Sequence, residues 1–489
     1  MSDDRLDREL GELLRAAADV EVPAGLDGRI AAIPDRGRAP LRPNLRGALR
    51  LGSLLVGGLI VLALAWGLPR IAPAADQSGT PSSATSRPTT VTKPTARPCT
   101  TAIPTTNPRG TGPTPTPYPA TPTPRVPGGP TPATAPGSFK QTGSMAGARY
   151  GAAATRLEDG RVLIVGGVAG SYYLASAELY DPVTCRFQAA GTLPSARAGF
   201  TATLLQDGRV LIAGGNVVGS TSGTTDAYLY DPATGLFSPT GALQAGRFAH
   251  SATLLEDGRV LIVGGVAPPA AGQGNSVDLS SAELFDPRTG TFSSTGSLST
   301  VRQGAAVALL PDGKVLFAGG NNGSGYTGDL SSAELYDPAT GSFKPTGSMV
   351  EGWGDSAVAL KDGRVLVLGE IRNLPIGTMP ITRPSAEMYD PRTATFSVTG
   401  NPAAPAVVGW PWSLGAALLP DGRVFVLGGS TAQLFDPATG TFAPTASPTV
   451  RSEPAVVLLD DGTVLIAGGQ RSAGDEPGQA LASAEIFRP

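Results

Sequence analysis

From Met145 to Pro489 the chain repeats one pattern of hydrophobic and polar positions seven times. In each unit an apolar segment ends near an Asp-Gly pair, a second ends near Gly-Gly (Gly-Glu in the fifth unit), and a third resembles Ser-Ala-Glu-Leu-Tyr-Asp-Pro, followed in most units by a Thr-Gly-x-Phe turn. The aspartates of the Asp-Gly pairs are Asp159, Asp207, Asp257, Asp312, Asp362, Asp421 and Asp461. Since Asp-Gly suits a tight hairpin, each unit predicts four short strands. A repeat of roughly 40–60 residues with four strands is typical of a β-propeller.

The two ends of the repeat region predict how the ring closes. The seventh unit stops at residues 483–489 without an outer strand, whereas residues 137–143 repeat the outer-strand sequence of residues 341–347. We therefore expect the first strand of the domain to complete the last blade. Residues 137–489 would then form an all-β, seven-bladed propeller.

The connections between strands predict two different faces of this ring. Because the strands alternate in direction, the Asp-Gly and Asp-Pro turns of every unit must lie on one face. The connections after Gly-Gly lie on the other face, and they range from one residue, Ser430, to about fifteen, residues 266–280. A constant scaffold with one variable face is typical of a binding surface, so we expect function there.

An uncharged apolar segment, residues 51–69, is long enough to cross a membrane as a helix. The twenty residues before it hold five arginines and the twenty after it hold two. The positive-inside rule predicts a single-pass, bacterial-type cell-membrane protein with residues 1–50 in the cytoplasm and the propeller outside. A cleaved signal peptide is the alternative, because residues 72–74 read Ala-Pro-Ala, like a small-residue cleavage site.

Two further segments flank the predicted transmembrane helix. Residues 3–18 place leucines at spacings of three and four among charged residues, which indicates a short amphipathic helix. This helix could dock to a cytoplasmic protein or lie on the membrane surface, and the sequence does not decide between the two. Residues 70–136 are rich in Pro and Thr and predict a disordered, extended stalk that joins the anchor to the propeller.

Composition narrows the function classes. A formal charge of −3 gives no reason to expect a nucleic-acid partner, whose binding surfaces are usually rich in Lys and Arg. With one histidine and two cysteines the chain is poor in transition-metal ligands, so we expect no metal and no cofactor. Cys99 and Cys185 could form a disulfide in an oxidising compartment, but their pairing stays open.

The order of the motifs resembles the kelch repeat, in which Gly-Gly ends the second strand, Tyr-Asp-Pro ends the third, and an Arg precedes the next first strand. The resemblance covers all seven units and implies a β-propeller with the first strand nearest the axis. Kelch propellers include protein-binding, carbohydrate-associated and enzymatic domains. Galactose oxidase, a copper radical enzyme of this type, uses tyrosine and histidine ligands. A chain with a single histidine departs from that pattern, and we expect no oxidase chemistry.

Five units place an arginine ten residues before Asp-Gly, where the innermost strand begins. Five guanidinium groups around the channel mouth would attract carboxylates or sulfates. In the alternative, each arginine makes a structural bond to the backbone of a neighbouring blade. These arginines are Arg149, Arg197, Arg247, Arg302 and Arg451.

The fifth and sixth units have Gly352 and Pro411 in place of this arginine, and tryptophans lie beside them. They are Trp353, Trp410 and Trp412, near the short connection at Ser430. Exposed aromatic faces beside a gap in the rim suit sugar rings or apolar side chains. Filling of space between blades 5 and 6 is the alternative.

These observations favour a binding module over an enzyme. The leading hypothesis is a membrane-anchored propeller that binds a protein or glycan ligand outside the cell through its variable face. The first alternative is a transmembrane regulator that couples the propeller to a cytoplasmic partner of the N-terminal tail. The second is a metal-independent enzyme acting on polysaccharide, although no nucleophile motif accompanies the one histidine, His250.

Overall fold

The computed structural model describes residues 137–489 apart from 218–222, 269–275, 325–327, 352, 374–380, 404–413 and 474–475. The expectations for the tail, the apolar segment 51–69 and the stalk 70–136 lie outside the described residues. Within the described ranges, no helix has the length and apolar character to cross a membrane.

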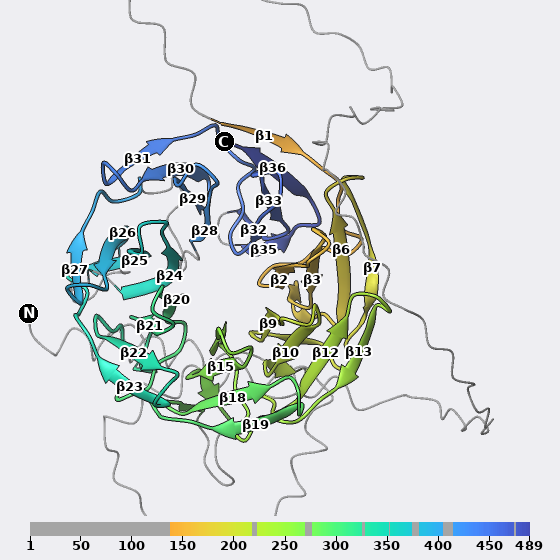
Figure 1. Cartoon of the computed structure of the whole chain (residues 1–489). Helices are drawn as coiled ribbons and strands as arrows, with labels where there is room; N and C mark the ends of the chain where they lie inside the picture. The colour runs from red at the N-terminus through yellow and green to blue at the C-terminus, as the bar shows by residue number, and fades with distance from the viewer. Residues whose placement is uncertain are drawn as a thin grey trace, which may run out of the picture. The chain divides into compact units, whose positions relative to one another are not determined.

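Seven antiparallel four-stranded sheets form a closed ring around a central axis (Figure 1). From the axis outward, blade 1 consists of β2 (Ala153–Arg156), β3 (Val162–Val165), β6 (Ser176–Asp181) and β7 (Arg186–Thr192). In the same order, blade 2 consists of β9 (Thr201–Leu204), β10 (Val210–Ala213), β12 (Ala227–Asp231) and β13 (Leu236–Pro239). Blade 3 consists of β14 (Ser251–Leu254), β15 (Val260–Val263), β18 (Ala282–Asp286) and β19 (Thr291–Ser294). Blade 4 consists of β20 (Ala306–Leu309), β21 (Val315–Ala318), β22 (Ala333–Asp337) and β23 (Ser342–Pro345). Blade 5 consists of β24 (Trp353–Ala359), β25 (Val365–Asn373), β26 (Ile381–Asp390) and β27 (Thr395–Val398). Blade 6 consists of β28 (Gly415–Leu418), β29 (Val424–Gly428), β30 (Thr431–Asp436) and β31 (Thr441–Pro444).

Blade 7 joins the two ends of the domain. Its inner strands are β32 (Ala455–Leu458), β33 (Val464–Ala467) and β36 (Ala484–Arg488), and its outer strand is β1 (Ser138–Gln141). β1 pairs antiparallel with β36, and the rings of Phe139 and Phe487 lie 5.0 Å apart. The predicted closure by the first strand of the domain is confirmed.

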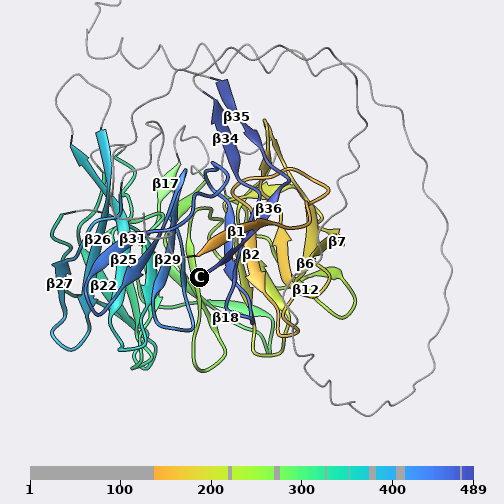
Figure 2. The same cartoon turned by 90° about the horizontal axis from the view of Figure 1, so that it is seen from above.

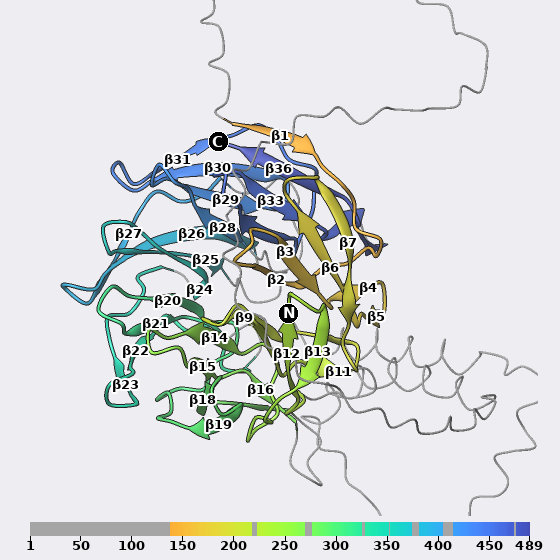
Figure 3. The same cartoon turned by 45° about the vertical axis from the view of Figure 1, so that its right-hand side comes forward.

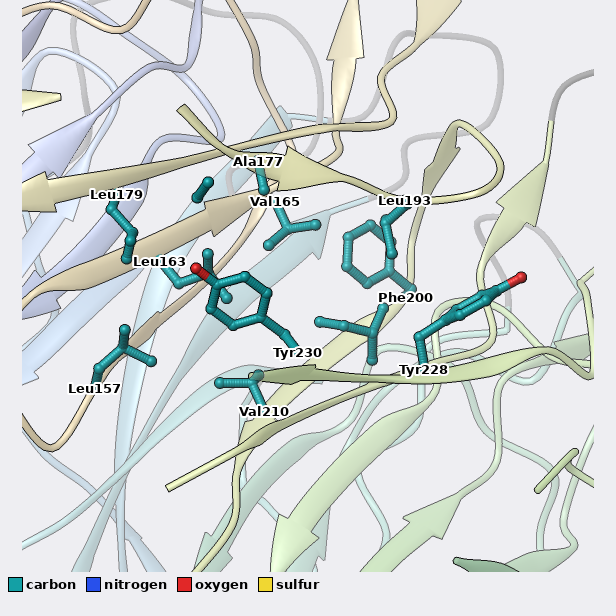
Figure 4. Close-up of a cluster of buried hydrophobic side chains, with 12 residues drawn as sticks. Leu157, Leu163, Val165, Ala177, Leu179, Leu193, Phe200, Val210, Tyr228 and Tyr230 are labelled. Atoms are coloured by element: carbon teal, nitrogen blue, oxygen red, sulfur yellow. The ribbon is translucent and has the colours of Figure 1, made fainter. Parts of the chain in front are cut away.

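The second strand of each blade begins with four apolar residues because both faces of its sheet are covered there. In β3, Leu163 and Val165 pack against residues of blade 2, among them Tyr230 (Figure 4). Val162 and Ile164, which alternate with them, pack against blade 7. The core therefore consists of apolar layers between neighbouring blades, and stability rests on every blade having two neighbours.

The ring has the two faces that the sequence predicts. The turn face holds the Asp-Gly and Asp-Pro turns, and the hairpin face holds the connections after Gly-Gly. Figure 2 shows β34 and β35 standing out on the hairpin face, and Figure 3 shows β4, β5, β11 and β16 along one edge. The small strands of this face are β4 (Val168–Ala169) with β5 (Tyr172–Tyr173), β8 (Arg197–Ala198) with β11 (Asn216–Val217), β16 (Val266–Ala267) with β17 (Val277–Asp278), and β34 (Gln470–Ala473) with β35 (Glu476–Ala480).

The hairpin face is irregular where blades 5 and 6 meet. In blade 5 the main strands themselves are long, nine residues in β25 and ten in β26. In blade 6 Gly428 pairs directly with Thr431, so two residues, Gly429 and Ser430, make the connection where the sequence predicted one. The shortest connection thus stands beside a blade with long strands, whereas the longest connection that the sequence indicated, residues 266–280, belongs to blade 3.

Candidate functional site

The charged groups of the turn face satisfy one another. The carboxylate of Asp159 accepts hydrogen bonds from the backbone N of Arg161 at 3.0 Å and from its Nε at 2.7 Å. Arg161 also donates to the carbonyl of Pro232 in the next blade at 3.4 Å. Arg209 and Arg364 donate to the next blade in the same way. These repeated contacts hold neighbouring blades together, so the candidate site lies on the hairpin face.

The five arginines expected around the channel mouth are buried. Arg247 shows the arrangement: its Nη1 donates to the carbonyls of Gly264 (2.9 Å) and Ser281 (3.0 Å), and its Nη2 lies 2.7 Å from Oε1 of Glu283. Burial lowers the pKa of Arg247 and the charge of Glu283 opposes that shift. Exposed fractions are 0–2% for Arg149, Arg197, Arg247, Arg302 and Arg451.

The same pairing recurs with one exchange of partner. The ion pairs Arg149–Glu178, Arg302–Glu334 and Arg451–Glu485 measure 2.8, 3.0 and 3.7 Å. In blade 2 a tyrosine, Tyr228, takes the position of the glutamate, and the guanidinium carbon of Arg197 lies 4.9 Å from the ring centroid. A cation over an aromatic face is attracted by the ring quadrupole, so each of these buried charges has a partner.

Each arginine also links its blade to the preceding one through the backbone. The N–H of Gly265 donates to the carbonyl of Arg302 at 3.0 Å, and Gly469 donates to that of Arg149 at 2.8 Å, across the closure of the ring. The arginines therefore position the hairpin face and do not offer guanidinium groups to a ligand. In the alternative that the sequence left open, each arginine makes a structural bond to the backbone of a neighbouring blade. The arginines are indeed structural, but their guanidinium groups bind carbonyls of their own blade.

The channel mouth is formed by the residues that lie two positions after these arginines. They are Gly151, Gly199, Ala249, Gly304 and Glu453, all with positive φ. Gly151 donates its N–H to the carbonyl of Glu453 (3.1 Å), Ala249 to that of Gly199 (2.9 Å), and Gly304 to that of Ala249 (3.1 Å). Sequence reasoning missed this mouth ring, although the recurrence of small residues at one position was a signal for it.

The tryptophans are only partly placed. Trp353 is the first residue of β24 and its backbone pairs with Glu370, while Trp410 and Trp412 lie outside the described residues. The described part of the junction between blades 5 and 6 encloses a cavity of about 10 Å³, lined by Glu370, Leu414 and others. That volume holds about one water molecule. The tryptophan site stays a prediction.

His250 has a structural position. It is 7% exposed, and its Nε2 lies 3.0 Å from Oγ1 of Thr201 in the neighbouring blade. Burial, and secondly the charge of Arg247, lower the pKa of His250 to about 3. The imidazole is therefore neutral at ordinary pH, and it lies between two blades.

Cys185 occupies a turn position with φ of 58°, where blades 2, 3, 4 and 6 have glycine and blade 5 has Ala394. It is disulfide-bonded, and the only other cysteine in the sequence, Cys99, lies outside the described residues.

Comparisons with known proteins show the fold. No protein-family model and no curated protein matches the chain. Among solved structures, a fungal alcohol oxidase of the AA5 family, in complex with copper, is similar with a TM-score of 0.51 and 17% identity over 73% of this chain and 77% of that one. The chain is thus a seven-bladed, kelch-type propeller that resembles this oxidase in architecture.

The residues of this chain do not fit the copper of that neighbour. Copper sites in proteins draw mainly on imidazole and sulfur ligands, and Nε2 of the single histidine, His250, is taken by Thr201. In the described ranges, no three His, Cys, Asp or Glu residues gather as metal ligands would.

Proposed function

We propose that residues 137–489 are an extracytoplasmic ligand-binding module, anchored through residues 51–69, whose hairpin face binds a protein or glycan ligand. The anchor and the location follow from the sequence pattern of the N-terminal region. The binding role follows from the contrast between the two faces of the ring.

That contrast is the observation that carries the proposal. On the turn face the same Asp-Gly-Arg contacts recur and link neighbouring blades, as in Arg161, Arg209 and Arg364. On the hairpin face the connections range from two residues in blade 6 to about fifteen, residues 266–280, in blade 3, and blade 5 has the long β25–β26 pair. Since the buried arginines hold the base of this face rigid, the varied hairpins can present different side chains without loss of the ring.

Within this face, Trp353, Trp410 and Trp412 are the residues that we propose to contact the ligand. Their sequence positions flank the connections of blades 5 and 6, where the hairpin lengths differ most. Aromatic side chains give large contact areas to sugar rings and to apolar side chains.

The test uses the full chain in detergent on an array of glycans and cell-surface proteins. A triple variant, Trp353→Ala, Trp410→Ala and Trp412→Ala, is compared with a turn-face control, Arg288→Ala, whose side chain is 87% exposed. We expect specific binding that the triple variant loses by at least tenfold and the control retains, with both variants folded by circular dichroism. Binding that both folded variants keep equally would contradict the tryptophan assignment, and absence of binding would contradict the proposed function.

A further inference from the structure

One member of the mouth ring differs from the others in its side chain. At the position filled by Gly151, Gly199, Ala249 and Gly304 in other blades, blade 7 has Glu453 with φ of 52°. Left-handed backbone strains a residue that carries a long side chain, and glycine adopts it without cost. Residues held in such conformations cluster at functional sites, so Glu453 is a candidate for function.

The carboxylate of Glu453 is half-buried and has no hydrogen bond or ion pair with the described residues. Burial alone raises the pKa of Glu453. By contrast, Glu178, Glu283 and Glu334 each form a close ion pair with an arginine of their own blade. A half-buried carboxylate without a partner gains more from a bound cation than an exposed one does.

Tyr150 precedes Gly151 of the mouth ring, and backbone pairing connects it through Val168 to a second tyrosine, Tyr173. Tyr150 and Val168 exchange backbone hydrogen bonds of 3.0 and 2.9 Å, and Val168 pairs with Tyr173 on its other side. Directly paired residues point to the same face of a sheet, so Tyr150 and Tyr173 flank Val168 on one surface, about 10 Å apart. A Cβ at Gly151 would lie 3.2 Å from Oε2 of Glu453, so the carboxylate lies beside the residue that follows Tyr150.

The groups around this position agree with the assignment. Burial first, then Glu453 and Tyr173, raise the pKa of Tyr150, as expected of neighbours within electrostatic reach. The neighbouring hairpin of blade 7 contributes Arg471, which is exposed and forms no ion pair with Glu453. All three ligand-facing groups are at most half-exposed, and the adjoining Gly151 is exposed.

One carboxylate beside aromatic rings suits an organic cation better than a metal ion. Calcium takes six or more oxygen ligands, and the described residues hold no cluster of three acidic or other metal-binding side chains. An ammonium or guanidinium group needs a single carboxylate, and it is further attracted to the faces of tyrosine rings.

We propose that Glu453, Tyr150 and Tyr173 form a site at the channel mouth that binds an ammonium or guanidinium group carried by the ligand. This inference rests on the proposed function, because it states which chemical group the ligand presents to the hairpin face between blades 7 and 1.

The experiment uses small probes, so that its outcome does not depend on finding the natural ligand. The full chain in detergent is titrated with n-butylammonium, n-butylguanidinium and the neutral n-butanol, and binding is followed by saturation-transfer NMR and calorimetry. We expect at least one cation to bind tenfold or more tightly than butanol. The ammonium and guanidinium arms show which of the two groups the site prefers.

Two variants make the result specific to the site. Glu453→Gln keeps the shape and Glu453→Gly suits the left-handed backbone; both should remain folded and lose cation binding by at least tenfold. Tyr150→Leu should weaken it by a smaller factor. Glu256→Gln, an exposed carboxylate of the turn face, is the matched control and should bind as wild type does.

Absence of cation binding to the wild-type protein, or equal binding to folded Glu453→Gln, would overturn the proposal. These outcomes are distinct from failure of the binding function itself. If the protein binds the cations but no ligand on the array, the cation site is supported and the proposed binding function is contradicted. If it binds an array ligand but no cation, the binding function is supported and the cation site is contradicted.

Discussion

At the residue scale, the same side chains that suggested a binding site turn out to hold the scaffold. Arg302 is 2% exposed, bonds the carbonyls of Gly319 and Ser332, and pairs with Glu334 at 3.0 Å. A charge taken from water in this way is stable only with all its partners in place. The buried arginines therefore determine the positions of the hairpins above them.

Replacement of Arg302 by Met should destabilise the ring by about 3 kcal/mol, because Glu334 would be left buried without its cation. Arg288→Met is the matched control: its side chain is 87% exposed, and the change should cost less than about 0.5 kcal/mol. Thermal unfolding followed by circular dichroism measures both. Equal midpoints for the two variants would contradict the structural role of Arg302.

His250 should make stability depend on pH. Its pKa is about 3 in the folded protein against an ordinary value of 6.5. Below pH 6.5 the imidazole therefore binds a proton in the unfolded chain but stays neutral in the folded chain. Stability should therefore fall as pH drops from 6.5 toward 3, by up to about 1.4 kcal/mol per pH unit from this group.

The measurement is the unfolding midpoint of wild type and His250→Gln between pH 7 and pH 4.5. Carboxylates contribute equally to both curves, so the difference between them isolates His250. The wild-type protein should lose stability faster than the variant on acidification, and parallel curves would show that His250 is not buried in neutral form.

At the element scale, the Gly-Gly pair that follows the second strand in every blade except blade 5 serves the contact between blades. A Cβ at Gly265 would lie 2.5 Å from the carbonyl oxygen of Phe248. The N–H of Gly265 donates to the carbonyl of Arg302 in the next blade. The φ of Gly265 is +85°. Two separate constraints, backbone conformation and space, thus require glycine here.

Gly265→Ala should lower the unfolding midpoint more than Gly235→Ala does. Gly235 also has positive φ, at +71°, but nothing lies within 4 Å of a Cβ there. The control therefore carries only the conformational cost of about 1–2 kcal/mol, and the excess loss in Gly265→Ala measures the clash between blades. Equal losses would mean that the close approach is readily relieved.

Sequence reasoning succeeded where the determinants are local. Apolar runs, Asp-Gly pairs and Gly-Gly pairs predicted the blades, their turns and the closure by β1, because each depends on residues close together in the chain. The direction of the Arg247 side chain depends on Glu283, 36 residues away, and could not be read from spacing. Nor could the mouth ring, since its hydrogen bonds join different blades, as between Gly151 and Glu453.

At the scale of the whole molecule, the ring is closed by pairing between its two ends. β1 is held to blade 7 by its bonds to β36 and by the contacts of Phe139 with Phe425 and Phe487. The outer strand of blade 6, β31, has the equivalent Phe442 against Phe435, but a tight turn also joins it to β30. Only in blade 7 does closure depend on noncovalent contacts alone.

Phe139→Ala and Phe442→Ala should each cost about 1–2 kcal/mol, because both rings are partly buried. Only Phe139→Ala should also expose residues 137–145 to limited proteolysis, since β1 can then leave the ring. Similar cleavage patterns for the two variants would argue against closure through β1.

The central claim is that ligand binds the hairpin face, and attachment of a bulky group to one face at a time tests it most directly. Tyr172→Cys places a thiol on the hairpin face and Leu236→Cys one on the turn face, at positions 74% and 64% exposed. Each is labelled without reductant by a polyethylene-glycol maleimide, and binding to the glycan and surface-protein array is measured before and after. We expect the label at residue 172 to block binding and the label at residue 236 to leave it unchanged. Binding blocked from the turn face, or unaffected by either label, would contradict it.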